Sequence, residues 1–215
     1  LRVASVITDP VTTTDELIPS GETSSYRSNP LKLSEFALSR KDPAYVGRAK
    51  AVQAFETARR AGEDTAAGEL SDVFAKIRGI KPEADAKNVG IGSVVYANKP
   101  GDGSAREQAA SCQKVLGGWA NIAIEYATKR YRSNLINWGM LPFLFDDASA
   151  FEVGDHVYVP DVRAAVEAAK YEFPAYIIKA DGSVKEITLK MGELTDDERT
   201  IILCGCLINY YKAGN

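Results

Sequence analysis

The residues best placed to do chemistry lie in one glycine-rich segment, residues 101–108, which reads GDGSAREQ. Glycines such as Gly101 and Gly103 let a backbone turn tightly and approach a ligand closely. A helix that begins directly after such a turn points its free N–H groups and the positive end of its dipole back at the turn. Ser104 and Arg106 would then face an anion, and the guanidinium of Arg106 could bind a carboxylate through two parallel hydrogen bonds.

Plainer interpretations of this segment remain open on spacing alone. Glycine turns before helices are common, and Ser104 is equally suited to be the ordinary N-cap of the following helix. The segment is not a nucleotide-binding P-loop, because the Gly-Lys-Ser/Thr ending is missing. The pattern therefore indicates an anion site without fixing its chemistry.

The elements around this segment alternate between strands and helices, which predicts one α/β domain over residues 1–215. A long loop rich in Thr, Ser, Gly and Pro separates the first strand from the first helix, at residues 11–29, and long loops inside compact domains tend to be functional. We expect strands at residues 2–8, 89–97, 119–125, 140–145, 156–159, 175–179 and 184–191. We expect helices at residues 45–62, 70–79, 104–116, 128–138, 162–170 and from 195 to about 212.

Composition excludes several classes of protein. A net charge of −3 gives no electrostatic footprint for nucleic acid, and no apolar stretch approaches the roughly 20 residues that span a bilayer. The opening LRVASV reads as a strand and not as a signal peptide. Cys112, Cys204 and Cys206 match no metal-binding spacing, so we expect reduced thiols and a cytoplasmic protein, with the last two in the core. His156 alone cannot supply a metal site and is interpreted as a loop residue.

Four segments in a fixed order resemble the aconitase superfamily, which includes aconitase, homoaconitase and the isopropylmalate isomerases. GSAREQA at residues 103–109 resembles the family motif Gly-Ser-Ser-Arg-Glu-His/Gln-Ala, and TTDELIPSG at residues 13–21 resembles Thr-Asp-His-Ile-Ser-Pro-Ala-Gly. RSNLINWGMLPF at residues 132–143 looks like the family's Asn-then-Gly-Leu-Leu-Pro helix and strand. GDHV at residues 154–157 is similar to its Gly-Asp-x-Val/Ile turn. The four landmarks cover most of the chain.

The resemblance implies a fold and a set of roles. The fold would be that of the C-terminal swivelling domain: a mixed, partly barrel-like β-sheet layered with helices, with a helical insert at about residues 31–80. Ser104 would be the base that removes a proton beside a substrate carboxylate. Arg106 and Arg27 would bind carboxylates, Arg27 lying twelve residues after Asp15 as in aconitases, and Asp15 would hydrogen-bond in the same site. Alternatively, Arg27 is a surface residue and Asp15 only stabilises a turn.

Two departures from the family matter. The second serine of the motif is Ala105 here, which leaves proton abstraction possible but removes a hydroxyl that helps to bind substrate. The family's 4Fe-4S cluster rests on three cysteines of a separate region, and no cysteine of this chain matches them. We therefore expect this chain to bind no cofactor and no metal, and to work with partner domains that carry the cluster.

Three alternatives follow for the protein as a whole. It is the C-terminal domain of a single-chain hydratase, with the cluster domains in cis, or the natural small subunit of a heterodimeric isopropylmalate or homoaconitate isomerase, with the cluster on a large subunit. The missing initiator Met and the insert at residues 31–80 favour the first. In both, a small hydroxy di- or tricarboxylic acid is dehydrated and rehydrated. The third alternative is a non-catalytic module that binds anions or RNA, which the acidic balance disfavours.

Overall fold

Seven strands close into a barrel in the computed structural model, which describes residues 1–214. Their order around the barrel is β1-β3-β5-β6-β9-β8-β7, and β7 pairs with β1 to close it. The pairs β1–β3, β3–β5 and β5–β6 are parallel, and the remaining pairs are antiparallel. The mixed, barrel-like sheet predicted from the sequence is therefore confirmed. The strands are β1 (Arg2–Ile7), β3 (Ser93–Ala97), β5 (Gly118–Ala123), β6 (Leu141–Leu144), β7 (His156–Tyr158), β8 (Glu172–Ile178) and β9 (Val184–Lys190).

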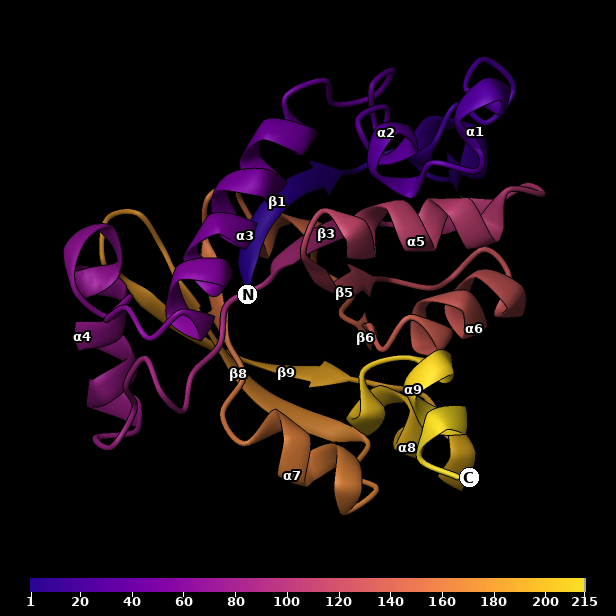
Figure 1. The fold of residues 1–215 in the computed structure, drawn as a ribbon. Coiled ribbons are helices and arrows are strands. Elements are labelled where there is room, and N and C mark those ends of the chain that lie inside the picture. The colour runs from indigo at the N-terminus through magenta and orange to yellow at the C-terminus, as the bar shows by residue number, and fades with distance from the viewer. Residues whose placement is uncertain (215) are drawn as a thin grey trace.

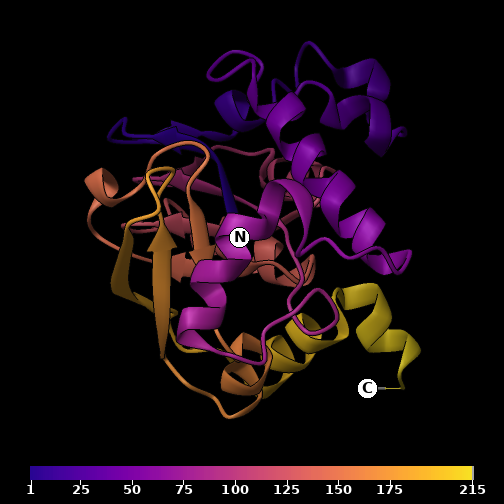
Figure 2. The ribbon, with the colours of Figure 1, turned by 90° about the vertical axis from the view of Figure 1, so that its left-hand side faces the viewer.

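Helices cover the barrel on several sides (Figure 1). The helices α3, α5 and α6 pack beside the parallel strands, and the short α1 and α2 contact α5. Figure 2 shows α4 across the end of the barrel where the N-terminus lies. The helices are α1 (Thr14–Leu17), α2 (Pro30–Ser34), α3 (Tyr45–Arg60), α4 (Ser71–Ile80), α5 (Arg106–Val115), α6 (Lys129–Asn137), α7 (Val162–Glu167), α8 (Asp196–Cys204) and α9 (Leu207–Lys212). Single 3-10 turns occur at Ser24–Tyr26, Gly68–Leu70 and Ala148–Ala150.

Two apolar cores lie on either side of the parallel strands. Val94 and Tyr96 of β3 point into the barrel, whereas Val95 and Ala97 point toward the helices α3 and α5. Successive side chains of a strand face opposite sides, so a strand buried on both faces carries a continuous apolar run. The predicted strand at residues 89–97 has such a run at its centre, Val94-Val95-Tyr96.

The structure corrects several local expectations. The segment 11–29 is not a plain loop: Thr13 caps α1, and Thr13 and Glu16 form a reciprocal capping box. The last predicted helix is two helices, because Gly205 adopts φ +90 and ends α8.

Three side chains also lie elsewhere than predicted. His156 opens strand β7 and does not lie in a loop. Cys204 and Cys206 are half-buried, so the prediction that they are core residues is wrong.

A second, two-stranded sheet positions the glycine-rich segment. The strands β2 (Thr12–Thr13) and β4 (Pro100–Asp102) pair in parallel, with Thr12 opposite Pro100 and Thr13 opposite Asp102. They follow β1 and β3, which are themselves parallel neighbours. Segments 87 or more residues apart in sequence are thereby brought together at the carboxyl ends of these strands. Within residues 1–214, no helix has the length and apolarity needed to cross a membrane.

Candidate active site

The turn between β4 and α5 presents Ser104 to solvent. The N-cap of α5 is Ala105, and no side chain accepts a hydrogen bond from the first turn of this helix. Ser104 is exposed, and within residues 1–214 its hydroxyl makes no hydrogen bond. The N-cap interpretation of Ser104 is therefore wrong. Its hydroxyl and the free N–H groups at the start of α5 lie in the same turn, ready for a ligand.

Both glycines of the turn are required by close packing. Gly101 has φ +97, and a Cβ atom there would lie 2.3 Å from Cγ of Tyr131. Gly103 has φ +131, and its Cβ would lie 2.3 Å from the hydroxyl oxygen of Thr14. The backbone of the turn thus rests on α6 at one point and on α1 at the other.

Arg106 holds an unsatisfied guanidinium next to this turn. The residue is half-buried, and its Nε atom is buried with no hydrogen-bond partner. Its neighbour Glu107 instead accepts a hydrogen bond from the indole of Trp138, at 3.2 Å. A buried donor without a partner is unfavourable by about 1–3 kcal/mol, more for a charged group. Within residues 1–214, no acidic side chain is ion-paired with Arg106.

Asp15 lies beside the turn but is already paired. It follows Thr14, which Gly103 touches, so α1 and the turn are in direct contact. The carboxylate of Asp15 is ion-paired with Arg40, whose guanidinium also binds Glu22. Sequence reasoning missed Arg40, and no local signal could have revealed it, because it lies 25 residues from its partner.

Arg27 lies on the same side of the barrel without touching the other three. It is exposed at the end of the 3-10 turn Ser24–Tyr26. The ring of Tyr26 stacks on Phe36 at 5.5 Å, and both Tyr26 and Ala105 pack against one apolar cluster. Within the described part of the chain, no hydrogen bond or ion pair connects the side chain of Arg27 to Ser104, Arg106 or Asp15. The structure thus places Asp15 on the helix that contacts the turn of Ser104 and Arg106, with its carboxylate paired to Arg40, and leaves Arg27 on a separate segment.

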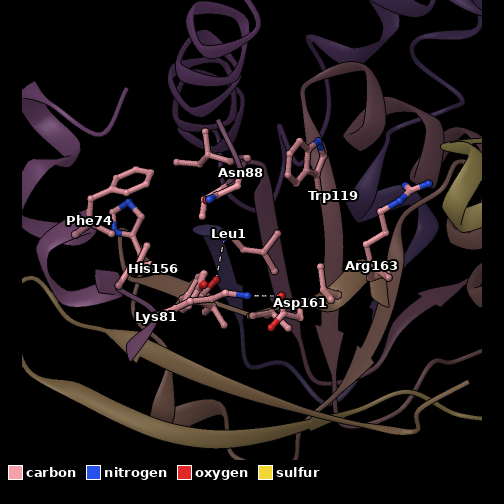
Figure 3. Close-up of a pocket in the computed structure, with 18 of the residues that line it drawn as sticks. Leu1, Phe74, Lys81, Asn88, Trp119, His156, Asp161 and Arg163 are labelled. Atoms are coloured by element: carbon pink, nitrogen blue, oxygen red, sulfur yellow. Dashed lines mark hydrogen bonds and ion pairs between the residues drawn. The ribbon is translucent and has the colours of Figure 1, made fainter. Parts of the chain in front are cut away.

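A cavity of about 560 Å³ lies at the opposite end of the barrel (Figure 3). Leu1, Gly90, Trp119 and Leu141 line it, and all four lie at or before the starts of the parallel strands. None of the four predicted site residues reaches it. The cavity is therefore separate from the Ser104 turn.

The charges at this cavity are largely balanced by one another. Lys81 pairs with Asp161, as Figure 3 shows, and lies 3.8 Å from Glu83. Burial lowers the pKa of His156 to about 3, so its imidazole is neutral at pH 7. Arg163 donates a hydrogen bond to the carbonyl of Leu203 at 3.0 Å. A cavity with apolar walls and compensated charges is a poor match for a substrate with two or three carboxylates.

The described residues do not offer a site for an iron–sulfur cluster. Among residues 1–214 there is no group of three or more His, Cys, Asp or Glu side chains that could hold a metal ion. Burial raises the pKa of Cys112 to about 12, which keeps this thiol protonated and unsuited to ligation. Cys204 and Cys206 are free thiols at the break between α8 and α9.

Comparisons with known proteins found similarities in both sequence and fold. Residues 81–148 match the family model of the aconitase C-terminal domain, a stretch that contains the turn, Ser104 and Arg106. Aconitate hydratase A of Rickettsia bellii (strain RML369-C) is 34% identical over 136 residues, which cover 61% of this chain but only 14% of that protein. The crystal structure of 3-isopropylmalate dehydratase (LeuD) from Methanocaldococcus jannaschii is similar in fold, with a TM-score of 0.57 and 23% identity. That match covers 99% of this chain and 92% of the solved one.

Both sequence matches are to aconitases, and the fold match is to a dehydratase. The shared stretch contains the glycine-rich turn, and the solved structure has the same barrel-and-helix architecture over nearly the whole chain. Residues 81–148 are thus similar to the C-terminal domain of aconitases, and the chain spans only a small part of the aconitate hydratase that it matches.

Proposed function

We propose that this chain is the substrate-binding and proton-abstracting half of an aconitase-type hydratase. Its substrate would be a small hydroxy di- or tricarboxylic acid, bound at the turn that carries Ser104. The observation that carries the proposal is the arrangement at this turn. An exposed serine whose hydroxyl caps nothing precedes by two residues a half-buried arginine whose Nε has no partner, at the uncapped start of α5.

The charge of the site supports an anionic substrate. The side chains of Arg106 and Arg27 have no acidic partner within the described part of the chain, whereas Lys81 at the far cavity is paired with Asp161. A substrate carboxylate at Arg106 would satisfy the guanidinium with two parallel hydrogen bonds. Arg27, on an exposed segment at the edge, would reach a second carboxylate when the domain closes on its partner.

Ser104 would act as the base in the proton transfer. A serine hydroxyl is too weakly acidic to lose its proton unaided, so the alkoxide needs local positive potential. The N-terminus of α5 and the guanidinium of Arg106 supply that potential, and closure would exclude the water that weakens it. The proton on the carbon next to the substrate carboxylate would then pass to Oγ of Ser104. Asp15 would hydrogen-bond within the same substrate site.

The remainder of the active site would belong to partner domains. The matched stretch covers 14% of the aconitate hydratase of Rickettsia bellii, so most of that relative has no counterpart in this chain. The family's 4Fe-4S cluster would lie on such a partner, because the described residues of this chain do not fit it. We derive from this chain only substrate binding and proton removal, and we expect it to be inactive alone.

The test is a serine-to-alanine pair in the assembled enzyme. We would join the chain to its cluster domains, reconstitute with iron and sulfide, and assay citrate, homocitrate and isopropylmalate. Ser104→Ala should lower kcat by about 10²-fold or more, as expected for loss of a general base. Ser71→Ala is the matched control, since Ser71 is exposed on α4 far from the turn. Unchanged turnover in Ser104→Ala would remove Ser104 from the mechanism and with it the proposal.

A second candidate is a natural small subunit rather than a domain of a longer chain. The solved 3-isopropylmalate dehydratase chain is matched over 92% of its own length, so it is of about the same size as this chain. Isopropylmalate would then be the preferred substrate. Activity that requires a separately expressed cluster protein, with isopropylmalate turned over faster than citrate, would favour the subunit.

A further inference from the structure

Three buried polar side chains form a closed ring of hydrogen bonds beneath the Ser104 turn. Nε2 of Gln113 donates to the hydroxyl of Tyr131 at 2.9 Å, and that hydroxyl donates to Oδ1 of Asn121 at 2.8 Å. Nδ2 of Asn121 donates to Oε1 of Gln113 at 2.6 Å, which completes the ring. The three residues are 0–3% exposed. They come from α5, β5 and α6, so the ring joins three elements at one point.

This ring has one arrangement only. Nδ2 of Asn121 also donates to the carbonyl of Ala120 at 3.0 Å, which orients this amide, so the Tyr131 hydroxyl accepts from Gln113 and donates to Asn121. The second N–H of the Gln113 amide donates to the carbonyl of Ala109 at 3.0 Å. Apolar side chains of the same volume would hold these elements together equally well, because burying polar groups carries a desolvation penalty. A satisfied polar network instead fixes orientation, and that is its advantage here.

The ring of Tyr131 supports the turn directly. Gly101 lies against it so closely that a Cβ would be 2.3 Å from Cγ and 2.5 Å from Cβ of the tyrosine. The start of α6 also binds the turn, since the hydroxyl of Thr128 donates to the carbonyl of Gly101 at 3.3 Å. Just before α6, the N–H of Ala127 donates to the carbonyl of Pro100 at 3.0 Å. These contacts with α6 and its N-terminal flank thus fix the position of the turn relative to α6.

The same network holds the other side of the site. Gln113 lies on α5, the helix that begins at Arg106, and its amide bonds within the first half of that helix, at Ala109. One closed set of hydrogen bonds therefore fixes both the strand end before Ser104 and the helix after it. A shift of the tyrosine hydroxyl would move the turn relative to α5.

We propose that Tyr131 is a positioning residue for Ser104, and that its hydroxyl, more than its ring, sets where the serine meets the substrate. The inference rests on the proposed function for its catalytic consequence, but its structural claim does not. Proton transfer needs the reacting atoms within a fraction of an ångström of their best geometry, and misplacement by about 1 Å can lower a rate 10²-fold. Tyr131 touches no substrate.

The test compares two tyrosine-to-phenylalanine variants. Tyr131→Phe removes the hydroxyl and leaves the ring beneath Gly101. Tyr126→Phe is the matched control, because its hydroxyl also donates to buried backbone, at 3.0 Å to Phe143 and 3.3 Å to Asn121. The Tyr126 ring lies 6.2 Å from that of Tyr131. Both variants lose one buried hydroxyl, but only Tyr131→Phe opens the ring of hydrogen bonds.

Two readouts decide the matter. In the isolated chain, amide hydrogen exchange at Ala109, whose N–H donates to the carbonyl of Ala105 at 3.0 Å, should accelerate about tenfold in Tyr131→Phe and stay unchanged in Tyr126→Phe, with β8 and β9 unaffected in both. In the assembled enzyme, Tyr131→Phe should lower kcat about tenfold and change KM less than about twofold, because substrate binding depends on the arginines.

The outcomes separate the two proposals. Exchange that accelerates equally throughout the chain, or not at all, would overturn the positioning role of Tyr131. So would an unchanged kcat in an enzyme that Ser104→Ala inactivates. If Ser104→Ala leaves turnover intact, the proposed function fails, whereas accelerated exchange at Ala109 would still establish that the hydroxyl fixes the start of α5 next to the turn.

Discussion

Adding one methyl group at Gly101 tests whether the turn really rests on Tyr131. Gly101→Ala introduces two separate penalties. The backbone has φ +97, a conformation that a residue with a Cβ adopts with strain, and the new methyl would lie 2.3 Å from the tyrosine ring. The chain contains a natural control for the first penalty. Gly154 has φ +96, and a Cβ there would meet nothing within 4 Å.

The expected sizes follow from this geometry. The positive φ is unfavourable for alanine by about 1–2 kcal/mol, partly offset by about 0.4–1 kcal/mol because alanine restricts the unfolded chain. Gly154→Ala should therefore destabilise by about 1 kcal/mol. At Gly101 the ring must move roughly 1 Å to reach ordinary contact distance, but it is fully buried and hydrogen-bonded. Overpacking of this kind adds about 1–3 kcal/mol.

The assay is urea unfolding at equilibrium, followed by far-ultraviolet circular dichroism. We expect Gly101→Ala to lower the free energy of unfolding by about 1–3 kcal/mol more than Gly154→Ala. The double variant Gly101→Ala/Tyr131→Ala separates contact from strain. Once the ring is gone, the methyl has space, and its effect should fall to that of Gly154→Ala. Equal destabilisation by the two single variants would refute the contact between the turn and α6.

Two further predictions concern residues outside the turn. Burial holds the pKa of His156 at about 3 in the folded chain, below its unfolded value, so the unfolded state alone takes up a proton as the pH falls from 6.5. The free energy of unfolding should then decrease by up to about 1.4 kcal/mol per pH unit, and His156→Gln should flatten this dependence in urea titrations at pH 4–7. Ala169 follows α7 with φ +55, where glycine is the preferred residue, so Ala169→Gly should raise the melting temperature, corresponding to about 0.5–1 kcal/mol. A lower melting temperature would contradict the strained backbone at this position.

The sequence could predict those elements whose local pattern matches their surroundings. The helix α3 could be predicted because its buried residues Tyr45, Ala49 and Val52 recur on one face. The strand β3 was readable because both its faces are buried, which leaves an apolar run. The C-terminal helix was extended too far because Gly205 was not recognised as a stop. The apolar residues on both sides of it continue the pattern, whereas the backbone there turns left-handed.

The short elements next to the site escaped prediction for a different reason. The helix α1 has only four residues, too few to show a period. Its capping box, Thr13 with Glu16, was present in the sequence as Thr-x-x-Glu and could have indicated a helix start within the segment interpreted as a loop. The ion pair of Asp15 with Arg40 has no comparable sequence pattern. An ion pair between residues far apart depends on the fold and cannot be predicted from local sequence.

The candidate residues were named from the sequence, but their arrangement depends on the barrel. The strands β1 and β3 are paired in parallel from Arg2–Ser93 to Ile7–Ala97. The segments that leave them must run side by side, which produces the β2–β4 pair and places Thr14 against Gly103. The contact between α1 and the Ser104 turn is thus a consequence of the register of β1 and β3. We expect this contact to persist when residues outside these strands are substituted. Arg27 has no such constraint, since it follows the 3-10 turn Ser24–Tyr26, whose Tyr26 stacks on Phe36. In the proposed function, Ser104 would thus be positioned by the barrel register and Arg27 by a separate segment.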